Sequence, residues 1–226
     1  MKIFGFVLLI SVIVFPFMEV IAKEKTFKKV ELVELVKLDP SIKPDIRYAT
    51  KNNFLKRPVY KLAKVYLQEP VAESLIRVNQ SLKKDGYGLF VFDGYRPWSV
   101  TKLFWDEIEA EKRSFVADPK IGSNHNRGCA VDLTLYDLKD GKEVKMPTEY
   151  DTFSEDAYPT SHFGTKEERK MRDFLINQME KHDFTVHPNE WWHYDHKDCS
   201  KYEILDIPLE SIPSEGLSEN DKSERR

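Results

Sequence analysis

The sequence predicts an α+β fold, a single domain in which a mostly antiparallel central sheet is flanked by helices. Segments with helical periodicity and segments with strand periodicity alternate along the chain, which indicates both kinds of element in one domain. The gaps between the strands are irregular in length, and the chain has no glycine-rich phosphate loop. These features favour an antiparallel sheet over a doubly wound parallel one.

The composition is that of an ordinary globular protein. The chain has 226 residues, of which 41% are hydrophobic and 32% charged, so it does not have the apolar-poor composition of a disordered chain. The net charge is -3, so no global basic field indicates a nucleic-acid partner.

The amino-terminal residues 1–22 resemble a cleaved secretory leader. Lys2 precedes the apolar stretch Ile3–Val14, and small residues stand where a leader peptidase cuts. The alternative is a transmembrane anchor, but the apolar run is short and is followed by Pro16 and Glu19. We therefore expect export to the periplasm or cell envelope, with no stable membrane insertion after cleavage.

The rest of the chain divides into a folded domain, 23–209, and a tail, 210–226. The tail has three apolar residues among many charges, so it buries too little surface to offset the entropy of ordering it. We expect the tail to be disordered.

The first half of the domain should contain one long helix between strands. Leu32–Leu38 is a short apolar and charged run that predicts a strand, and Asp45–Phe54 is expected to be irregular. Pro70–Lys84 has apolar residues spaced four, three and four apart, which predicts a helix with one apolar stripe. Asp85-Gly86 should end this helix, and the apolar run Tyr87–Phe92 should be a buried strand.

The second half should contain two further helices and three strands. Trp98–Glu111 has apolar residues every four positions and predicts a helix, and Lys166–Lys181 predicts another. Ala130–Tyr136 alternates strictly between apolar and other residues, as a strand does. Phe184–Val186 and Trp191–Tyr194 are expected to be the last strands.

The first motif with chemical content runs from Ser123 to Asp132. His125 lies in an approach to a strand that is rich in Ser, Asn and Gly, and Asp132 lies on that strand opposite its apolar side chains. A buried carboxylate needs a partner, and a metal ion or an arginine would provide one. The alternative is a solvent-facing Asp on a half-exposed strand.

The second motif runs from His187 to His196. His193 lies in an aromatic strand and Glu190 precedes it by three residues, so a regular strand would point the two side chains to opposite faces. Pro188-Asn189 predicts instead that Glu190 lies in the turn and leans over the same site. The alternative is an aromatic cluster that only fills the core.

Together the motifs supply two histidines and one aspartate, with one glutamate nearby. Three nitrogen or oxygen ligands with an open fourth position are typical of catalytic zinc, and a nearby glutamate can take a proton from water that zinc acidifies. The rival is the two-histidine, one-carboxylate site of Fe(II) oxygenases. His125 and Asp132 are seven residues apart rather than two, and the extra Glu190 favours hydrolysis, so we expect one Zn²⁺ per chain.

The chain resembles the zinc D-Ala-D-Ala metallopeptidases, and among them the D-alanyl-D-alanine dipeptidases of the VanX type. Five segments in order carry the resemblance, over most of the expected domain: RYAT-x-x-NF from Arg47, DGYRP from Asp93, SxHxxGxAxD from Ser123, Tyr150-Asp151, and EWWHY from Glu190.

The resemblance implies a role for each matched residue. His125, Asp132 and His193 would bind zinc, and Glu190 would be the general base. Arg96 would stabilise the oxyanion of the tetrahedral intermediate.

Two further matched residues would bind the substrate. Asp151 would bind the free amino terminus of a dipeptide, and Ser123 would contact the backbone ends. The expected activity is hydrolysis of D-Ala-D-Ala, in cell-wall metabolism or glycopeptide resistance. The alternatives are a carboxypeptidase that trims peptidoglycan stems, for which Asp151 would be dispensable, and a zinc-binding cell-wall protein without turnover, which would need neither Glu190 nor Arg96.

Some features depart from the family pattern. Only 29 residues separate Arg96 from His125, which is shorter than the resemblance leads us to expect and weakens the expectation of strict selectivity for dipeptides. Cys129 stands where a small Ser or Ala is usual, and it either pairs with Cys199 or both are buried thiols. The other four histidines match no ligand position and are expected to be structural or solvated: His162, His182, His187 and His196.

Overall fold

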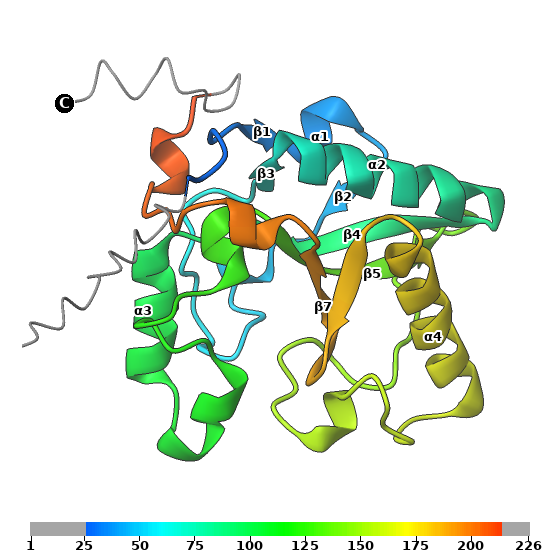
Figure 1. Cartoon of the computed structure of the whole chain (residues 1–226). Coiled ribbons are helices and arrows are strands. Elements are labelled where there is room, and N and C mark those ends of the chain that lie inside the picture. Colours follow the sequence, from blue (N-terminus) through cyan, green and yellow to red (C-terminus); the bar gives the residue numbers. More distant parts are fainter. Residues whose placement is uncertain (1–25, 214–226) are drawn as a thin grey trace, which may run out of the picture.

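The structure is a computed structural model that describes residues 26–213 (Figure 1). The expected leader, residues 1–22, and residues 214–226 of the expected tail lie outside the described residues. Within residues 26–213, every helix is too short or too polar to span a bilayer.

A five-stranded sheet in the order β2-β4-β5-β7-β6 forms the centre of the fold (Figure 1). Its neighbours pair antiparallel except for β2 and β4, which run parallel, so the expected mostly antiparallel sheet is confirmed. A second sheet pairs β1 with β3. The strands are β1 Leu32–Glu34, β2 Lys43–Pro44, β3 Tyr66–Gln68, β4 Tyr87–Asp93, β5 Ala130–Asp137, β6 Phe184–His187 and β7 Glu190–His196.

The helices lie outside the sheet, with α2 across one side of it and α4 beside β6 (Figure 1). The α-helices are α1 Leu35–Leu38, α2 Glu69–Lys84, α3 Trp98–Glu107 and α4 Lys166–Glu180. The 3-10 helices are η1 Arg47–Ala49, η2 Ala110–Phe115, η3 Asn124–Arg127, η4 Glu155–Ala157, η5 Cys199–Lys201 and η6 Leu209–Ser211.

The apolar stripe of α2 forms as predicted. Its four residues are completely buried where the helix packs on β4, which explains why this segment folds as one long helix. The helix ends at the Asp85 cap, and Gly86 follows with a φ of 87°, a conformation that favours glycine. The stripe comprises Val71, Leu75, Val78 and Leu82.

Two elements are markedly shorter than predicted, and Glu190 lies in a different element. The expected strand 32–38 is a strand only to Glu34 and then turns into α1, because its partner β3 has just three residues to pair with. The expected helix 98–111 ends at Glu107, and the chain continues into η2. Glu190, expected in the turn, is the first residue of β7.

The folded part extends beyond residue 209, where we expected the tail to begin. Residues Leu209–Ser211 form η6, and Ile212 is buried with the core. Ile212, near the start of the expected tail, therefore belongs to the packed domain.

Cys129 and Cys199 form a disulfide, which decides between the two alternatives that the sequence left open. Cys129 immediately precedes β5, and Cys199 lies in η5, just after β7. The bond therefore ties together the ends of two neighbouring strands at the centre of the sheet.

We expect this disulfide to contribute about 2–5 kcal/mol to the free energy of unfolding, because it closes a loop between residues separated by 70 positions. Urea unfolding followed by tryptophan fluorescence should show a lower midpoint under reducing than under oxidising conditions. The double variant C129A/C199A is the control, and its midpoint should not respond to reductant. Equal midpoints for the native chain in both conditions would contradict the expectation.

Candidate metal centre and active site

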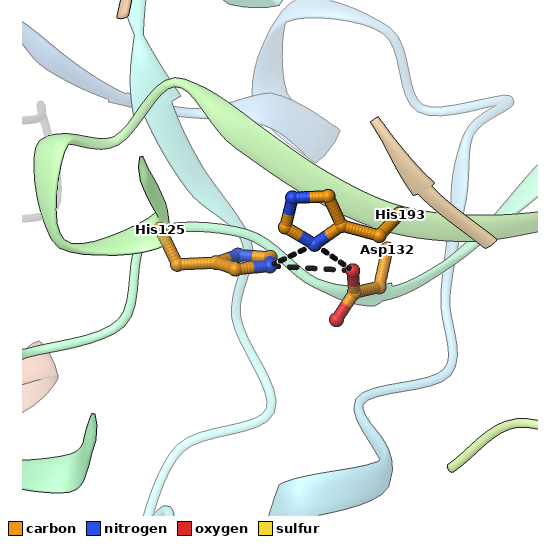
Figure 2. Close-up of side chains that lie close together, drawn as sticks. All are labelled: His125, Asp132 and His193. Carbon is orange, nitrogen blue, oxygen red and sulfur yellow. Dashed lines mark hydrogen bonds and ion pairs between the residues drawn. The ribbon is translucent and has the colours of Figure 1, made fainter. Parts of the chain in front are cut away.

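Three predicted ligands come together on the central sheet: His125 from η3, Asp132 from β5 and His193 from β7 (Figure 2). Asp132 and His193 are directly paired across β5 and β7. His125 Nε2 lies 3.2 Å from Asp132 Oδ1 and 3.1 Å from His193 Nδ1, and Asp132 Oδ1 lies 3.0 Å from His193 Nδ1. All three residues are buried, so the solvent-facing alternative for Asp132 is excluded.

The loop that carries His125 is held by its own side chains. Ser123 caps η3, its Oγ accepting a hydrogen bond from the His125 backbone N–H, while Asn126 Oδ1 accepts one from the Ser123 N–H. Gly128 ends η3 with a φ of 68°, and a Cβ there would lie 2.6 Å from a methyl carbon of Leu32. The glycine of the motif is thus required by both backbone conformation and packing.

Hydrogen bonds on the outer sides of the ligands fix their orientation. His125 Nδ1 donates a hydrogen bond to the carbonyl oxygen of Gly94 at 2.7 Å. In the neutral ring, Nε2 then carries the lone pair that can bind a metal ion. His193 Nε2 lies 3.0 Å from Asp195 Oδ1, and the Tyr150 hydroxyl donates to Asp132 Oδ2 at 2.9 Å. Such partners on the far side of each ligand are typical of metal sites.

The electrostatics of the cluster favour a positive charge at its centre. Burial works to raise the pKa of Asp132, but the imidazoles of His125 and His193 hold it well below its usual range. Burial works to lower the pKa of His193, yet the carboxylates of Asp132 and Asp195 raise it well above its usual range. A divalent cation would supply this positive charge in place of a proton.

The three ligand atoms fit a zinc ion. Ligand atoms in a tetrahedral zinc site lie about 2.0–2.1 Å from the ion and therefore about 3.3–3.4 Å from one another. The three separations here are 3.0–3.2 Å, and the donors are two nitrogens and one oxygen. Only small outward movements are needed to admit the ion.

Glu190 lies beside these ligands, with its Oε2 3.8 Å from His193 Nδ1. The two side chains reach the same site, although they are three residues apart in one strand, because the pairing of β6 with β7 shifts register between Val186 and His187. Burial is the main cause that raises the pKa of Glu190, to about 8. That range suits a group that takes up and releases a proton near neutral pH.

Arg96 is buried and rigidly held. Its Nε and Nη2 lie 2.9 and 2.8 Å from Asp93 Oδ2, and the guanidinium carbon lies 4.9 Å from the centre of the Phe104 ring. Nη2 is also 3.7 Å from Asp132 Oδ2. The guanidinium is therefore fixed close to the three ligands.

Asp151 is held from two sides. The Tyr48 hydroxyl donates to its Oδ1 at 3.0 Å, and the Phe54 backbone N–H donates to its Oδ2 at 3.3 Å. Its backbone has a φ of 58°, which is unusual for a residue other than glycine. Burial and then the charge of Asp132 raise its pKa to about 7.

One cavity of about 360 Å³ contains all seven predicted site residues in its walls. Ser123 lines it as well, although its hydroxyl also serves as the cap of η3. The remaining walls include parts of the short stretch between Arg96 and His125, namely residues 114–117 and 121–122. The two motifs therefore converge on one site. The alternative that the second motif only fills the hydrophobic core is excluded.

Sequence reasoning missed four residues that shape this site. Asp93, Tyr150 and Asp195 contact Arg96, Asp132 and His193 respectively and orient them. His187, expected to be structural or solvated, lines the cavity. Its ring centre is 5.1 Å from that of His193. The sequence could have predicted the role of Asp195. It stands two residues after His193 in a strand, so the two side chains share one face of the sheet.

Comparisons with known proteins show which family this chain resembles. A family model for D-Ala-D-Ala dipeptidases, in peptidase family M15, matches residues 28–208. The D-alanyl-D-alanine dipeptidase of Enterococcus faecium is 32% identical over 171 residues, which cover 66% of this chain and 83% of the relative. That of Escherichia coli K12 is 27% identical over 176 residues, covering 77% and 89%.

A solved structure of VanYB in complex with D-alanine-D-alanine is 16% identical, with a TM-score of 0.37, and the match covers 61% of this chain and 76% of that one. This likeness is too low to bear on the site. The family match alone extends over most of the described residues, so this chain belongs to the D-Ala-D-Ala dipeptidase family.

Proposed function

We propose that this chain is a zinc dipeptidase that hydrolyses D-alanyl-D-alanine to two D-alanines, with one Zn²⁺ per chain. The observation that carries the proposal is the convergence of His125, Asp132, His193 and Glu190 on one cavity. Membership of the dipeptidase family supports the choice of substrate.

His125, Asp132 and His193 hold the ion in this proposal. Bound zinc supplies Lewis acidity, which polarises a carbonyl group and makes water more acidic. Glu190 takes the proton from the attacking water and then gives it to the leaving amine. Its position beside His193, with its pKa raised by burial, suits both transfers.

Arg96 stabilises the negative charge that develops on the oxygen of the scissile carbonyl. A guanidinium has five N–H donors, and those on Nε and Nη2 face Asp93, so donors remain for a substrate oxygen. Because Asp93 fixes the group in advance, little reorganisation is needed during the reaction.

Asp151 binds the free amino terminus of the dipeptide, and Ser123 contacts its backbone ends. A largely buried carboxylate in the same cavity as the ligands favours a substrate with an ammonium group. This favours the dipeptidase over a carboxypeptidase that trims peptidoglycan stems. The presence of Glu190 and Arg96 disfavours a zinc-binding protein without turnover.

We also propose that the protein acts outside the cytoplasm, in the periplasm or cell envelope, either in cell-wall metabolism or in glycopeptide resistance. The leader-like residues 1–22 support export. The disulfide between Cys129 and Cys199 supports an oxidising compartment.

The direct test is to incubate the zinc-loaded protein with each of the four alanyl-alanine stereoisomers and to measure released alanine. We expect zinc-dependent hydrolysis of the D,D isomer and little of the others. D132A is expected to lose both zinc and hydrolysis, whereas H162A, which removes an exposed histidine, should keep both. Failure of the zinc-loaded protein to release D-alanine would refute the proposal.

E190Q should retain zinc but lose about 10²–10⁴-fold in kcat, because it removes the proton acceptor and leaves the ligands in place. Zinc content by mass spectrometry and steady-state kinetics measure the two effects separately. A variant with its zinc and near-normal kcat would show that Glu190 is not the base.

D151N should lower kcat/KM for D-alanyl-D-alanine by about 10- to 100-fold, because it replaces a charged partner of the ammonium with a neutral one. The amide keeps an acceptor for the Phe54 N–H, so the loop should remain in place. N-acetyl-D-alanyl-D-alanine is the matched comparison, since it has no ammonium group and its slow hydrolysis should not change. An equal loss for both substrates would argue against this role.

A further inference from the structure

Three phenylalanine rings line the cavity that also contains Asp151. Phe153 lies 5.3 Å from Phe54 between ring centres, and it stacks on Phe115 at 5.6 Å with an interplanar angle of 19°. All three rings are partly buried and line the cavity that holds the metal ligands. We call Phe54, Phe115 and Phe153 the aromatic clasp.

The clasp joins segments that are far apart in the sequence. Phe115 is the last residue of η2, in the short stretch between Arg96 and His125, and Phe153 lies in the connection from β5 to α4. η2 and part of the connection from β5 to α4 lie at the bottom of the view in Figure 1, on the side of β7 away from α2. The stack of Phe115 on Phe153 therefore joins the two loops where both line the cavity.

The clasp is anchored to the group that would bind the substrate's amino end. The Phe54 backbone N–H donates to Asp151 Oδ2, and Phe153 follows Asp151 by two residues. The Phe54 ring also packs edge-on against Phe104, 5.2 Å away between ring centres, which fixes it against α3. An ammonium bound at Asp151 would thus lie next to the three rings.

We propose that the aromatic clasp sets the length of the substrate by blocking any extension beyond its amino terminus. This inference rests on the proposed function, because it uses Asp151 as the site of the ammonium group. A residue or bulky group attached to that nitrogen would have to separate Phe115 from Phe153. The stretch after Arg96 contributes to this restriction through Phe115, which it places in the stack.

Charge alone is the competing explanation, because Asp151 would disfavour any substrate without an ammonium group. N-methyl- and N-benzyl-D-alanyl-D-alanine separate charge from bulk. Both are secondary amines that remain protonated, but only the benzyl compound carries a bulky group that would have to displace the aromatic clasp. The quantity to measure is kcat/KM for each compound divided by kcat/KM for D-alanyl-D-alanine, with the zinc-loaded protein.

For the native protein we expect the N-benzyl ratio to be lower than the N-methyl ratio by about 100-fold or more. F153A and F115A, which remove the stack from opposite loops, should each raise the N-benzyl ratio by about tenfold or more. F163A is the matched control, because Phe163 is exposed and lies outside this cavity, and it should leave both ratios unchanged.

Native-like N-benzyl ratios in both clasp variants, or efficient cleavage of the N-benzyl compound by the native protein, would overturn the inference while leaving the proposed function intact. Loss of D-alanyl-D-alanine hydrolysis by the native zinc-loaded protein would instead overturn the proposed function. Zinc content and thermal melting report whether each variant folds. If F153A does not fold, the ratio for F115A decides.

Discussion

The site depends on the register between β5 and β7, which places Asp132 directly opposite His193. A slip of one residue would turn one of these side chains to the other face of the sheet. The disulfide ties the ends of the same two strands, and the Ser123 cap holds His125 over them. The parts of the fold that fix the ligands are therefore close to the ligands themselves.

The cavity concentrates acidic side chains that cannot all be buried in their charged form without a positive partner. Asp93 is paired with Arg96, but Asp132, Glu190 and Asp151 lie within the same walls and share no second arginine or lysine as an ion-pair partner among the residues that the structure describes. Unpaired buried charge is costly. A divalent cation at the two histidines and a substrate ammonium at Asp151 would compensate for this charge. The negative charge of the cavity therefore supports both the metal ion and the substrate of the proposed function.

Much of the site was predictable from the sequence. His125 and Asp132 stand in a motif whose composition and strand position are unusual, and alternation along the strand correctly set the Asp apart from the apolar face. The sequence correctly predicted that Glu190 lies at the site, but the predicted reason was wrong. A register shift between β6 and β7, rather than a turn, brings Glu190 there. The disulfide and the contact between Phe115 and Phe153 join distant segments, and local patterns do not record such contacts.

The most direct test of the shared cation is X-ray absorption spectroscopy at the zinc edge of the zinc-loaded protein. The account predicts nitrogen and oxygen neighbours at about 2.0–2.1 Å, with two imidazole rings in the outer shells and no sulfur. H193A should remove one imidazole signal or the bound zinc. A spectrum of the native protein with no imidazole scattering, or with sulfur ligands, would contradict the account.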